Sequence, residues 1–381
     1  MTPTVTTPPV AAENPLKQLA RFGQSIWLDF IRRSLMTSGE LHKLIEQDGL
    51  AGMTSNPAIF EKAIVGGEEY ADFIAELRKD AALDAKGIYE RLAIRDIQDA
   101  ADALKSVYLA TNGRDGYVSL EVSPLLANDT NGTLQEARRL WSTVQRPNLM
   151  IKVPGTTAGL PAVEALLTEG INVNITLLFA RERYEEVAEI YVRALEARAQ
   201  QGLHLPAIAS VASFFVSRID TAIDARIDTL AAAADAPTRA LLESCRSKVA
   251  IANAKLAYES YHRIFSGPRW DALVAKGARV QRLLWASTST KSPKLRDVLY
   301  VEELIGKDTV NTIPPATYDA FRDHGVPRAS LEEGLEDART VMQNLAAAGI
   351  SMDQVTAELL DQGVKLFADA FVKLLGVVHA A

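Results

Sequence analysis

Short apolar segments separated by turn-forming residues recur along most of the chain. They are rich in valine, isoleucine, leucine and aromatic residues, and many end near glycine, proline or asparagine, which is the pattern of a buried β-strand. A clear example is LMIKVPGT at 149–156, where β-branched residues precede Pro154 and Gly155. Eight such strands are predicted, at residues 24–30, 50–56, 116–122, 149–156, 171–179, 207–214, 280–288 and 310–313.

Helical periodicity occupies most of the intervals between these strands. Because strands alternate with helices and the composition does not change abruptly after residue 20, the pattern predicts one α/β domain at 19–381, a closed (β/α)8 TIM barrel with additional helices. An open doubly wound sheet is the alternative, but no glycine-rich phosphate loop follows the early strands. The Thr/Pro/Ala-rich start, residues 1–18, is predicted to be a disordered tail. Helices are predicted at 38–49, 68–78, 86–109, 134–144, 160–167, 181–199, 218–265 (interrupted near Asp235), 331–348 and 352–375.

Polar residues occupy alternate positions in several predicted strands. Successive side chains of a strand point to opposite faces, so Ser119 and Glu121 share a face that excludes Leu120. The outward face of a barrel packs against helices, and we therefore expect the polar face to point inward, near the strand ends where barrel enzymes hold their active sites. One inward polar residue is usually structural, but four strands repeating the arrangement predict a site. These residues are Asp29, Ser119, Glu121, Ser123, Lys152, Asn172, Asn174, Thr176, Ser287 and Ser289, the last two with the parity of Trp285.

Lys152 stands in the middle of an apolar strand. A strand covered on both faces is almost continuously apolar, and an unpaired ammonium is costly to bury. Burial disfavours the charged form of a lysine, and a neutral amine in a pocket is the nucleophile that forms a Schiff base with a carbonyl. The structural alternative is a lysine that reaches solvent or pairs with a carboxylate.

The composition narrows the classes of partner. The formal net charge is −7 and no basic run is longer than a pair such as Arg32 and Arg33, which argues against nucleic acid and anionic membranes. Cys245 is the only cysteine, which suits a reducing compartment. Residues 1–14 lack the features of a secretory signal, and no apolar stretch approaches the length of a membrane span. These features predict a soluble, cytoplasmic protein.

The candidate chemistry is that of a lysine imine. Two carboxylates on different strands, Asp29 and Glu121, would serve as the acid–base groups that such a mechanism needs. Asn, Ser and Thr side chains would hold the hydroxyls of a polyhydroxylated substrate. The five histidines are scattered without the spacing of metal ligands, and no Gly-x-Ser-x-Gly elbow occurs. The sequence therefore predicts neither a metal nor a serine-hydrolase site.

Two segments of the sequence resemble signatures of the transaldolase family. Residues 52–58 (GMTSNPA) are similar to its N-terminal signature, and residues 149–159 (LMIKVPGTTAG) are similar to its active-site signature. The resemblance covers nearly the whole chain after the tail. It implies a class I aldolase-type barrel whose helix order is permuted relative to ordinary class I aldolases.

The resemblance also implies roles for individual residues. Lys152 matches the Schiff-base lysine, Asp29 the base for the C4 hydroxyl, and Glu121 the acid–base group that acts through a water with Thr176. Ser289 departs from the better-known branch of the family, which has a second phosphate-binding arginine there, and Lys291 is either its replacement or a solvated loop lysine. The substrate-binding candidates are Asn56, Asn174 and Ser213 for the dihydroxyacetone portion, and Arg218, Ser287 and Lys291 for the phosphate.

The implied reaction needs no cofactor. It transfers a dihydroxyacetone unit from sedoheptulose 7-phosphate or fructose 6-phosphate to glyceraldehyde 3-phosphate or erythrose 4-phosphate, in the non-oxidative pentose phosphate pathway. Three other readings stay open: a simple class I aldolase that releases free dihydroxyacetone, a pyridoxal-phosphate barrel enzyme, and a non-catalytic barrel that binds sugar phosphates. The sequence also leaves open whether the protein is a monomer or a homodimer.

Overall fold

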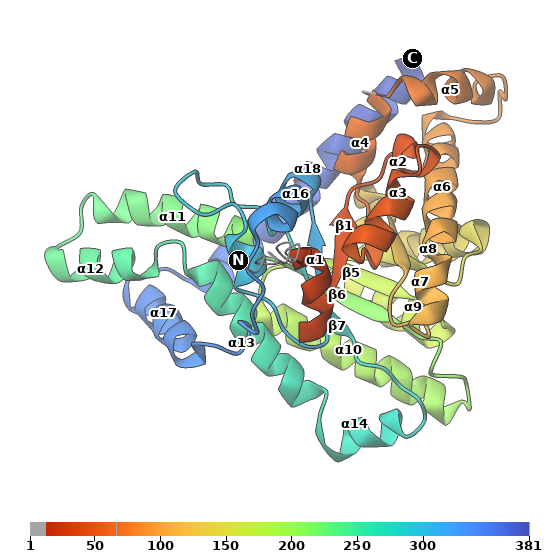
Figure 1. The fold of residues 1–381 in the computed structure, drawn as a ribbon. Coiled ribbons are helices and arrows are strands. Elements are labelled where there is room, and N and C mark those ends of the chain that lie inside the picture. Colours follow the sequence, from red (N-terminus) through yellow and green to blue (C-terminus); the bar gives the residue numbers. More distant parts are fainter. Residues whose placement is uncertain (1–12, 66, 381) are drawn as a thin grey trace, which may run out of the picture.

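Eight parallel strands close into a barrel in the computed structural model, which describes residues 13–65 and 67–380 (Figure 1). Each strand pairs with its neighbours in chain order, and β8 pairs with β1. All eight predicted strands are present, and the (β/α)8 TIM barrel is confirmed. The strands are β1 (Gln24–Asp29), β2 (Gly52–Thr54), β3 (Tyr117–Glu121), β4 (Leu149–Pro154), β5 (Val173–Leu178), β6 (Ser210–Phe215), β7 (Arg282–Ala286) and β8 (Thr309–Ile313).

The strand register brings the predicted polar residues to one face. Laterally paired residues of neighbouring parallel strands point the same way. Glu121 pairs with Lys152, and Lys152 pairs with Asn174, across β3, β4 and β5. On the other side of the barrel Asp29 pairs with Thr54. The predicted inward direction of the polar face is therefore confirmed for β1, β3, β4 and β5.

The predicted inward direction of the polar face is wrong for β7. Trp285 pairs with Phe214, and their rings meet edge to face at 6.2 Å between centroids. Phe214 in turn contacts Tyr184 of the surrounding helix α10, so Trp285 points outward into the helix layer. Ser287 lies beyond the end of the strand, with a left-handed φ of 56°, and its direction no longer follows the strand alternation. The alternation of residues along a strand does not indicate the residue at which the strand ends.

The helices that follow the strands agree with the predicted periodicity within a few residues. Leu104 divides the predicted 86–109 helix into two, and the predicted 218–265 region is divided twice, near Asp235 and near Ser247. Ser247 has a φ of 53° and separates α12 from α13. These helices are α5 (Ala71–Leu77), α6 (Ala85–Ala103), α7 (Lys105–Ala110), α8 (Thr130–Val144), α9 (Gly159–Glu169), α10 (Arg181–Gln200), α11 (Ser217–Ala231), α12 (Ala236–Cys245), α13 (Val249–Ile264) and α17 (Leu335–Ala347).

Several short helices were not predicted, and the predicted tail is too long. Residues 1–12 lie outside the described part, but α1 (Pro15–Gln18) is helical and buries Leu16, so the disorder predicted for 1–18 does not hold there. The predicted 38–49 helix is α3 (Glu40–Lys43) followed by a π-helical turn to Asp48. Most of the unpredicted helices are too short to show a clear apolar period. They are α2 (Arg33–Thr37), α4 (Pro57–Val65), α14 (Gly267–Val274), α15 (Leu299–Glu302) and α16 (Pro315–His324).

The last helix, α18 (Met352–Ala380), reaches back over the barrel. It runs beside α4 toward the C-terminus (Figure 1) and also contacts α6, α11 and β5. The helices α4 and α11 directly follow β2 and β6, and the loops that join them to these strands lie at the carboxyl end of the barrel. The C-terminal helix therefore covers the end of the barrel where Lys152 lies.

The opposite end of the barrel is closed by a buried ion pair. Arg282 lies 2.9 Å from Asp115 and also donates to Ser25 Oγ, while Trp27 Nε1 donates to the same carboxylate. Because the two charges pair with each other and the Ser25 hydroxyl and Trp27 N–H also donate to Asp115, the ion pair is tolerated in the core. This group therefore has a structural role at the amino ends of the strands.

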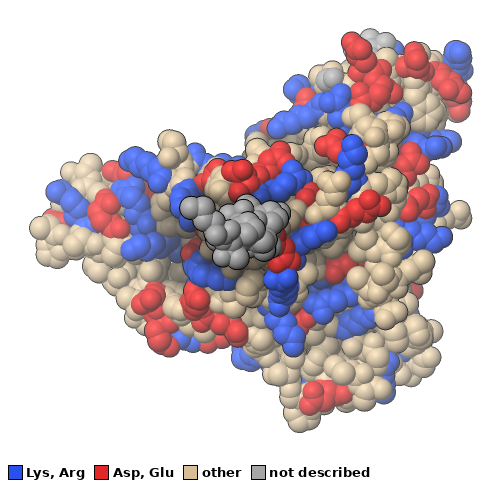
Figure 2. Space-filling model, viewed as in Figure 1, with Lys and Arg blue, Asp and Glu red and all other residues tan. Residues whose placement is uncertain are grey.

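The exposed surface is mixed in charge. On the face shown in Figure 2, basic and acidic side chains are interspersed. Within the described residues, no helix combines the length and apolar character that crossing a bilayer requires.

Candidate active site

Lys152 lies inside the carboxyl end of the barrel. Its side chain is buried with 4% of its surface exposed, and Nζ donates to the carbonyl oxygen of Ser55 at 3.1 Å. Glu121 Oε2 is 3.3 Å from Nζ, and the ring centroid of Phe367 is 5.7 Å away. Lys152 is therefore paired with a carboxylate, as in the structural alternative. Its partner, however, is Glu121, the residue predicted to act as the acid–base group.

Glu121 is placed to exchange a proton with Lys152. It ends β3 directly beside Lys152 on β4, and its carboxyl is buried. Burial raises the pKa of Glu121 to about 7, although the nearby charge of Lys152 opposes the shift. Neither carboxyl oxygen accepts a well-formed hydrogen bond from a described residue. Glu121 is thus a carboxyl that gains and loses a proton near neutral pH, which suits a general acid–base group.

Asp29 approaches the same space from the other side of the barrel. It ends β1 and accepts a hydrogen bond from Thr54 Oγ1 at 2.7 Å, and Thr54 in turn lies 2.6 Å from Thr312 Oγ1. Burial raises the pKa of Asp29, whereas Lys152, the Thr54 hydroxyl and Arg218 lower it. The two carboxyls stand on β1 and β3, separated by β2, so they are near enough to sense each other's charge without contact.

A chain of polar side chains lines the floor beside Lys152. Ser213 Oγ donates to Asn174 Oδ1 at 2.6 Å, and Asn174 Nδ2 donates to Ser119 Oγ at 3.0 Å. These bonds fix which end of the Asn174 amide faces which neighbour. Thr176 is fully buried, and its hydroxyl has no hydrogen-bond partner among the described residues. A β-bulge follows directly at Leu177, whose φ is 60°, and bulges often re-aim side chains next to active sites.

Asn56 also lies at the carboxyl end of the barrel, which we call the barrel mouth, and in addition it caps a helix. Its Oδ1 accepts a hydrogen bond from Ile59 N at 3.0 Å, which caps the start of α4. Only its amide NH2 is then available to a ligand. By contrast Asn172, another residue of the polar parity, donates to the carbonyl oxygens of Pro147 and Leu149 and serves the backbone.

Cationic side chains gather at the outer part of the mouth. Arg218 is the second residue of α11, is half-buried, and lies over the ring of Phe215 at 5.5 Å. Lys291 is exposed and donates to Ser289 Oγ at 2.7 Å, and partial desolvation together with the charges of Arg218 and Lys62 lowers the pKa of Lys291. Ser287 Oγ is 3.0 Å from Ser217 Oγ at the start of the same helix. Such a group suits an anion such as phosphate.

A known family matches most of the chain. A sequence model of the family described as "Transaldolase/Fructose-6-phosphate aldolase" matches residues 26–378. The chain belongs to this family. It is 50% identical over 366 residues to "Transaldolase" of Trichodesmium erythraeum, covering 95% of this chain and 96% of that protein. It is 51% identical to "Transaldolase 2" of Nostoc punctiforme and 48% identical to "Transaldolase" of Thiobacillus denitrificans, covering 95–96% of this chain and 96–99% of those proteins.

The two transaldolase-family signatures meet in space. Residues 52–58 run from β2 into α4 and contribute Ser55, whose carbonyl oxygen accepts from Lys152 Nζ. Residues 149–159 contain β4 and the turn into α9. Both segments are recognisable in the sequence, but the hydrogen bond from the lysine of one segment to the backbone of the other arises only in the folded chain.

Metal-binding clusters are not found beside this family site or elsewhere in 13–65 and 67–380, where no group of three or more His, Cys, Asp or Glu side chains is arranged to hold an ion. His324 lies 2.9 Å from Asp297, and His262 lies 3.4 Å from Glu332. Both histidines are exposed and belong to surface ion pairs.

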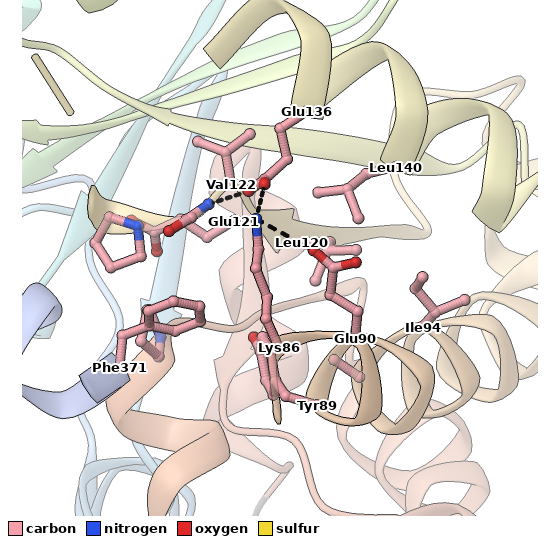
Figure 3. Close-up of a pocket in the computed structure, with 14 residues that line it drawn as sticks. Lys86, Tyr89, Glu90, Ile94, Leu120, Glu121, Val122, Glu136, Leu140 and Phe371 are labelled. Carbon is pink, nitrogen blue, oxygen red and sulfur yellow. Dashed lines mark hydrogen bonds and ion pairs between the residues drawn. The ribbon is translucent and has the colours of Figure 1, made fainter. Parts of the chain in front are cut away.

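Sequence reasoning missed the residues that hold the end of β3. On the outward side of this strand, Glu136 of α8 accepts from the backbone N–H of Ser123 and from Lys86 of α6 (Figure 3). Lys86 is also 3.7 Å from Glu90. These contacts anchor the backbone two residues after Glu121. Nothing in the sequence distinguishes them from ordinary helix-surface charges.

We expect replacement of Lys291 by alanine to raise KM for phosphorylated substrates and leave kcat little changed. An exposed lysine contributes at most about 1 kcal/mol to an ion pair, so the increase should be no more than roughly fivefold. Steady-state kinetics with the phosphorylated sugar would measure it. Lys294→Ala, an exposed lysine of the same loop, is the matched control. An unchanged KM in the Lys291 variant would identify Lys291 as a solvated loop residue.

Proposed function

We propose that this transaldolase-family protein transfers a dihydroxyacetone unit between sugar phosphates through a Schiff base on Lys152. The donor is a ketose phosphate, sedoheptulose 7-phosphate or fructose 6-phosphate, and the acceptor is glyceraldehyde 3-phosphate or erythrose 4-phosphate, as in the non-oxidative pentose phosphate pathway. The observation that carries the proposal is the buried amine of Lys152 at 3.3 Å from the Glu121 carboxyl, with Asp29 facing the same space.

The first step forms the imine. The neutral amine of Lys152 attacks the C2 carbonyl of the ketose and gives a carbinolamine. Glu121 then supplies the proton with which the C2 hydroxyl leaves as water, directly or through a water held with the help of Thr176. The raised pKa of Glu121 supports this step, since the carboxyl holds its proton up to about pH 7.

The second step breaks the C3–C4 bond. Asp29 accepts the proton of the C4 hydroxyl, the electrons of the bond move to the iminium nitrogen, and the aldose phosphate leaves. An enamine of dihydroxyacetone stays attached to Lys152. The positive iminium lowers the pKa of the neighbouring carboxyl, which favours the ionised Asp29 that the step requires. An acceptor aldose then takes the three-carbon unit by the reverse steps, and no cofactor is needed because the iminium itself accepts the electron pair.

The remaining candidate residues bind the substrate in this proposal. Asn174, Ser213 and the free amide NH2 of Asn56 face the three-carbon portion. Arg218, Ser287 and Lys291 face the phosphate farther out. The outward order of these two groups along the barrel mouth matches a ketose whose reactive end enters first.

We also propose the cytoplasm as the compartment. A chain with one cysteine forms no internal disulfide, and Cys245 is buried, which suits reducing conditions. The binding partners in this proposal are sugar phosphates. The acidic net charge of the chain disfavours binding of nucleic acid.

Borohydride trapping tests the nucleophile. Incubation with fructose 6-phosphate and reduction should leave a three-carbon adduct on the peptide that contains Lys152, as seen by mass spectrometry. Lys255 is a matched internal control, because it is also buried but lies on α13 and donates to the carbonyl oxygen of Glu333. An adduct on Lys255, or none on either lysine, would contradict the proposal. A simple aldolase would form the same adduct yet turn over at full rate without an acceptor.

A further inference from the structure

Helix α18 presents one continuous buried face to the barrel mouth. The buried positions recur at spacings of three and four, which is one side of a helix. Gly363 belongs to this face, and a Cβ placed on it would come within 2.9 Å of Leu177 Cδ2. Glycine is unfavourable inside a helix, so its use here fits a close approach of α18 to the bulge of β5. The buried residues are Val355, Thr356, Leu359, Gly363, Phe367, Phe371, Leu374 and Val378.

Phe367 lies one turn beyond Gly363 and faces the reactive lysine. Its ring centroid is 5.7 Å from Lys152 Nζ, and only 5% of the residue is exposed. The next residue of the same face, Phe371, instead packs against Tyr89 at 5.5 Å. Among the described aromatic residues of α18, Phe367 is the one whose ring lies over Lys152 Nζ. An apolar ring in this place excludes water from one side of the amine.

We infer that Phe367 shields the covalent three-carbon intermediate from water and so favours transfer over release. This inference rests on the proposed function. Release requires protonation of the enamine at C3, addition of water to C2 of the resulting imine, and cleavage of the C2–N bond, which returns the amine to Lys152 and frees dihydroxyacetone. Transfer needs no water at C2 until the acceptor has been joined. A ring over the nitrogen therefore slows release of dihydroxyacetone and does not hinder transfer to the acceptor.

The ratio of dihydroxyacetone release to transfer tests the inference. Release is measured with fructose 6-phosphate alone, and transfer is measured with erythrose 4-phosphate added as acceptor. Phe367→Ala should raise the ratio by about tenfold, whereas Phe367→Leu, which keeps an apolar cover, should change it less. Leu366→Ala is the matched control, because Leu366 is the neighbouring residue on the same helix and is exposed. It should leave the ratio at the wild-type value.

Borohydride trapping in the same variants separates the two proposals. If Lys152 is trapped in Phe367→Ala and the ratio does not rise, the shielding role is wrong and the nucleophile stands. If Lys152 is not trapped in the wild type, the proposed function itself fails. Thermal unfolding identifies a variant that fails to fold, and in that case Phe367→Val and Phe367→Thr, which are similar in size but differ in polarity, replace it. The threonine variant should give the higher ratio of release to transfer, and a wild-type ratio in well-folded Phe367→Thr would overturn the inference.

Discussion

Replacement of Lys152 by arginine is expected to abolish turnover, with a loss of at least about 10⁴-fold in kcat, as for other removed nucleophiles. A guanidinium stays protonated in proteins and cannot attack a carbonyl. Arginine places a positive charge beside Glu121, so the variant does not leave the buried carboxyl without a partner. A coupled assay of transfer would measure the loss, and borohydride trapping of the variant should give no adduct.

A matched control comes from the second buried lysine. Lys255→Arg changes the same side chain on α13, where the amine donates to a backbone carbonyl and lies 4.0 Å from Glu303. This variant should keep the wild-type kcat. Full activity in Lys152→Arg, with the protein folded, would refute the assignment of the nucleophile.

Glu121→Gln is expected to lower kcat by roughly 10²–10³-fold, within the range of general acid–base catalysis. Burial raises the pKa of Glu121 to about 7, so the carboxyl carries its proton below this pH and loses it above. Because expulsion of the hydroxyl needs that proton, kcat of the wild type should fall as pH rises beyond about 7, approaching tenfold for each pH unit. Glutamine has no proton to lose, and this alkaline decline should be absent from the residual activity.

The pH profile distinguishes this role from a structural one. Glu302→Gln is a suitable control, since Glu302 is a buried glutamate that pairs with Arg296 in the connection between β7 and β8. It should keep the alkaline decline of the wild type. An unaltered decline in Glu121→Gln would assign the titration to another group and remove Glu121 from the acid step.

Much of the barrel and of the site follows from local patterns. Strand–helix alternation predicts the closed barrel, because parallel strands need a crossover helix and eight strand–helix units are the number found in a TIM barrel. The two-residue alternation of strands predicts that Asp29, Glu121, Lys152 and Asn174 face inward, and the register confirms it. These inferences succeed because they depend only on the backbone period within one strand.

Predictions that depend on where an element ends are less successful. Ser287 has the strand parity of Trp285 in the sequence, yet Trp285 points outward and Ser287 has left the strand. The short helix α4 was not predicted because Pro57 directly follows the strand predicted at 50–56 and suggests a turn there, although proline is also favoured in the first turn of a helix. Both errors arise at boundaries, where a local signal has more than one interpretation.

The sequence by itself determined the barrel class, the inward face of four strands and the identity of the buried lysine. The tertiary structure alone decided which distant residues complete the site: Phe367, 215 positions beyond Lys152, Glu136 behind β3, and Lys62 near Lys291. Their sequence neighbourhoods are ordinary, since a phenylalanine on a helix or a lysine on a surface carries no local sign of what it will contact. The chemistry depends on distances between side chains of different elements, and only the folded chain sets those distances.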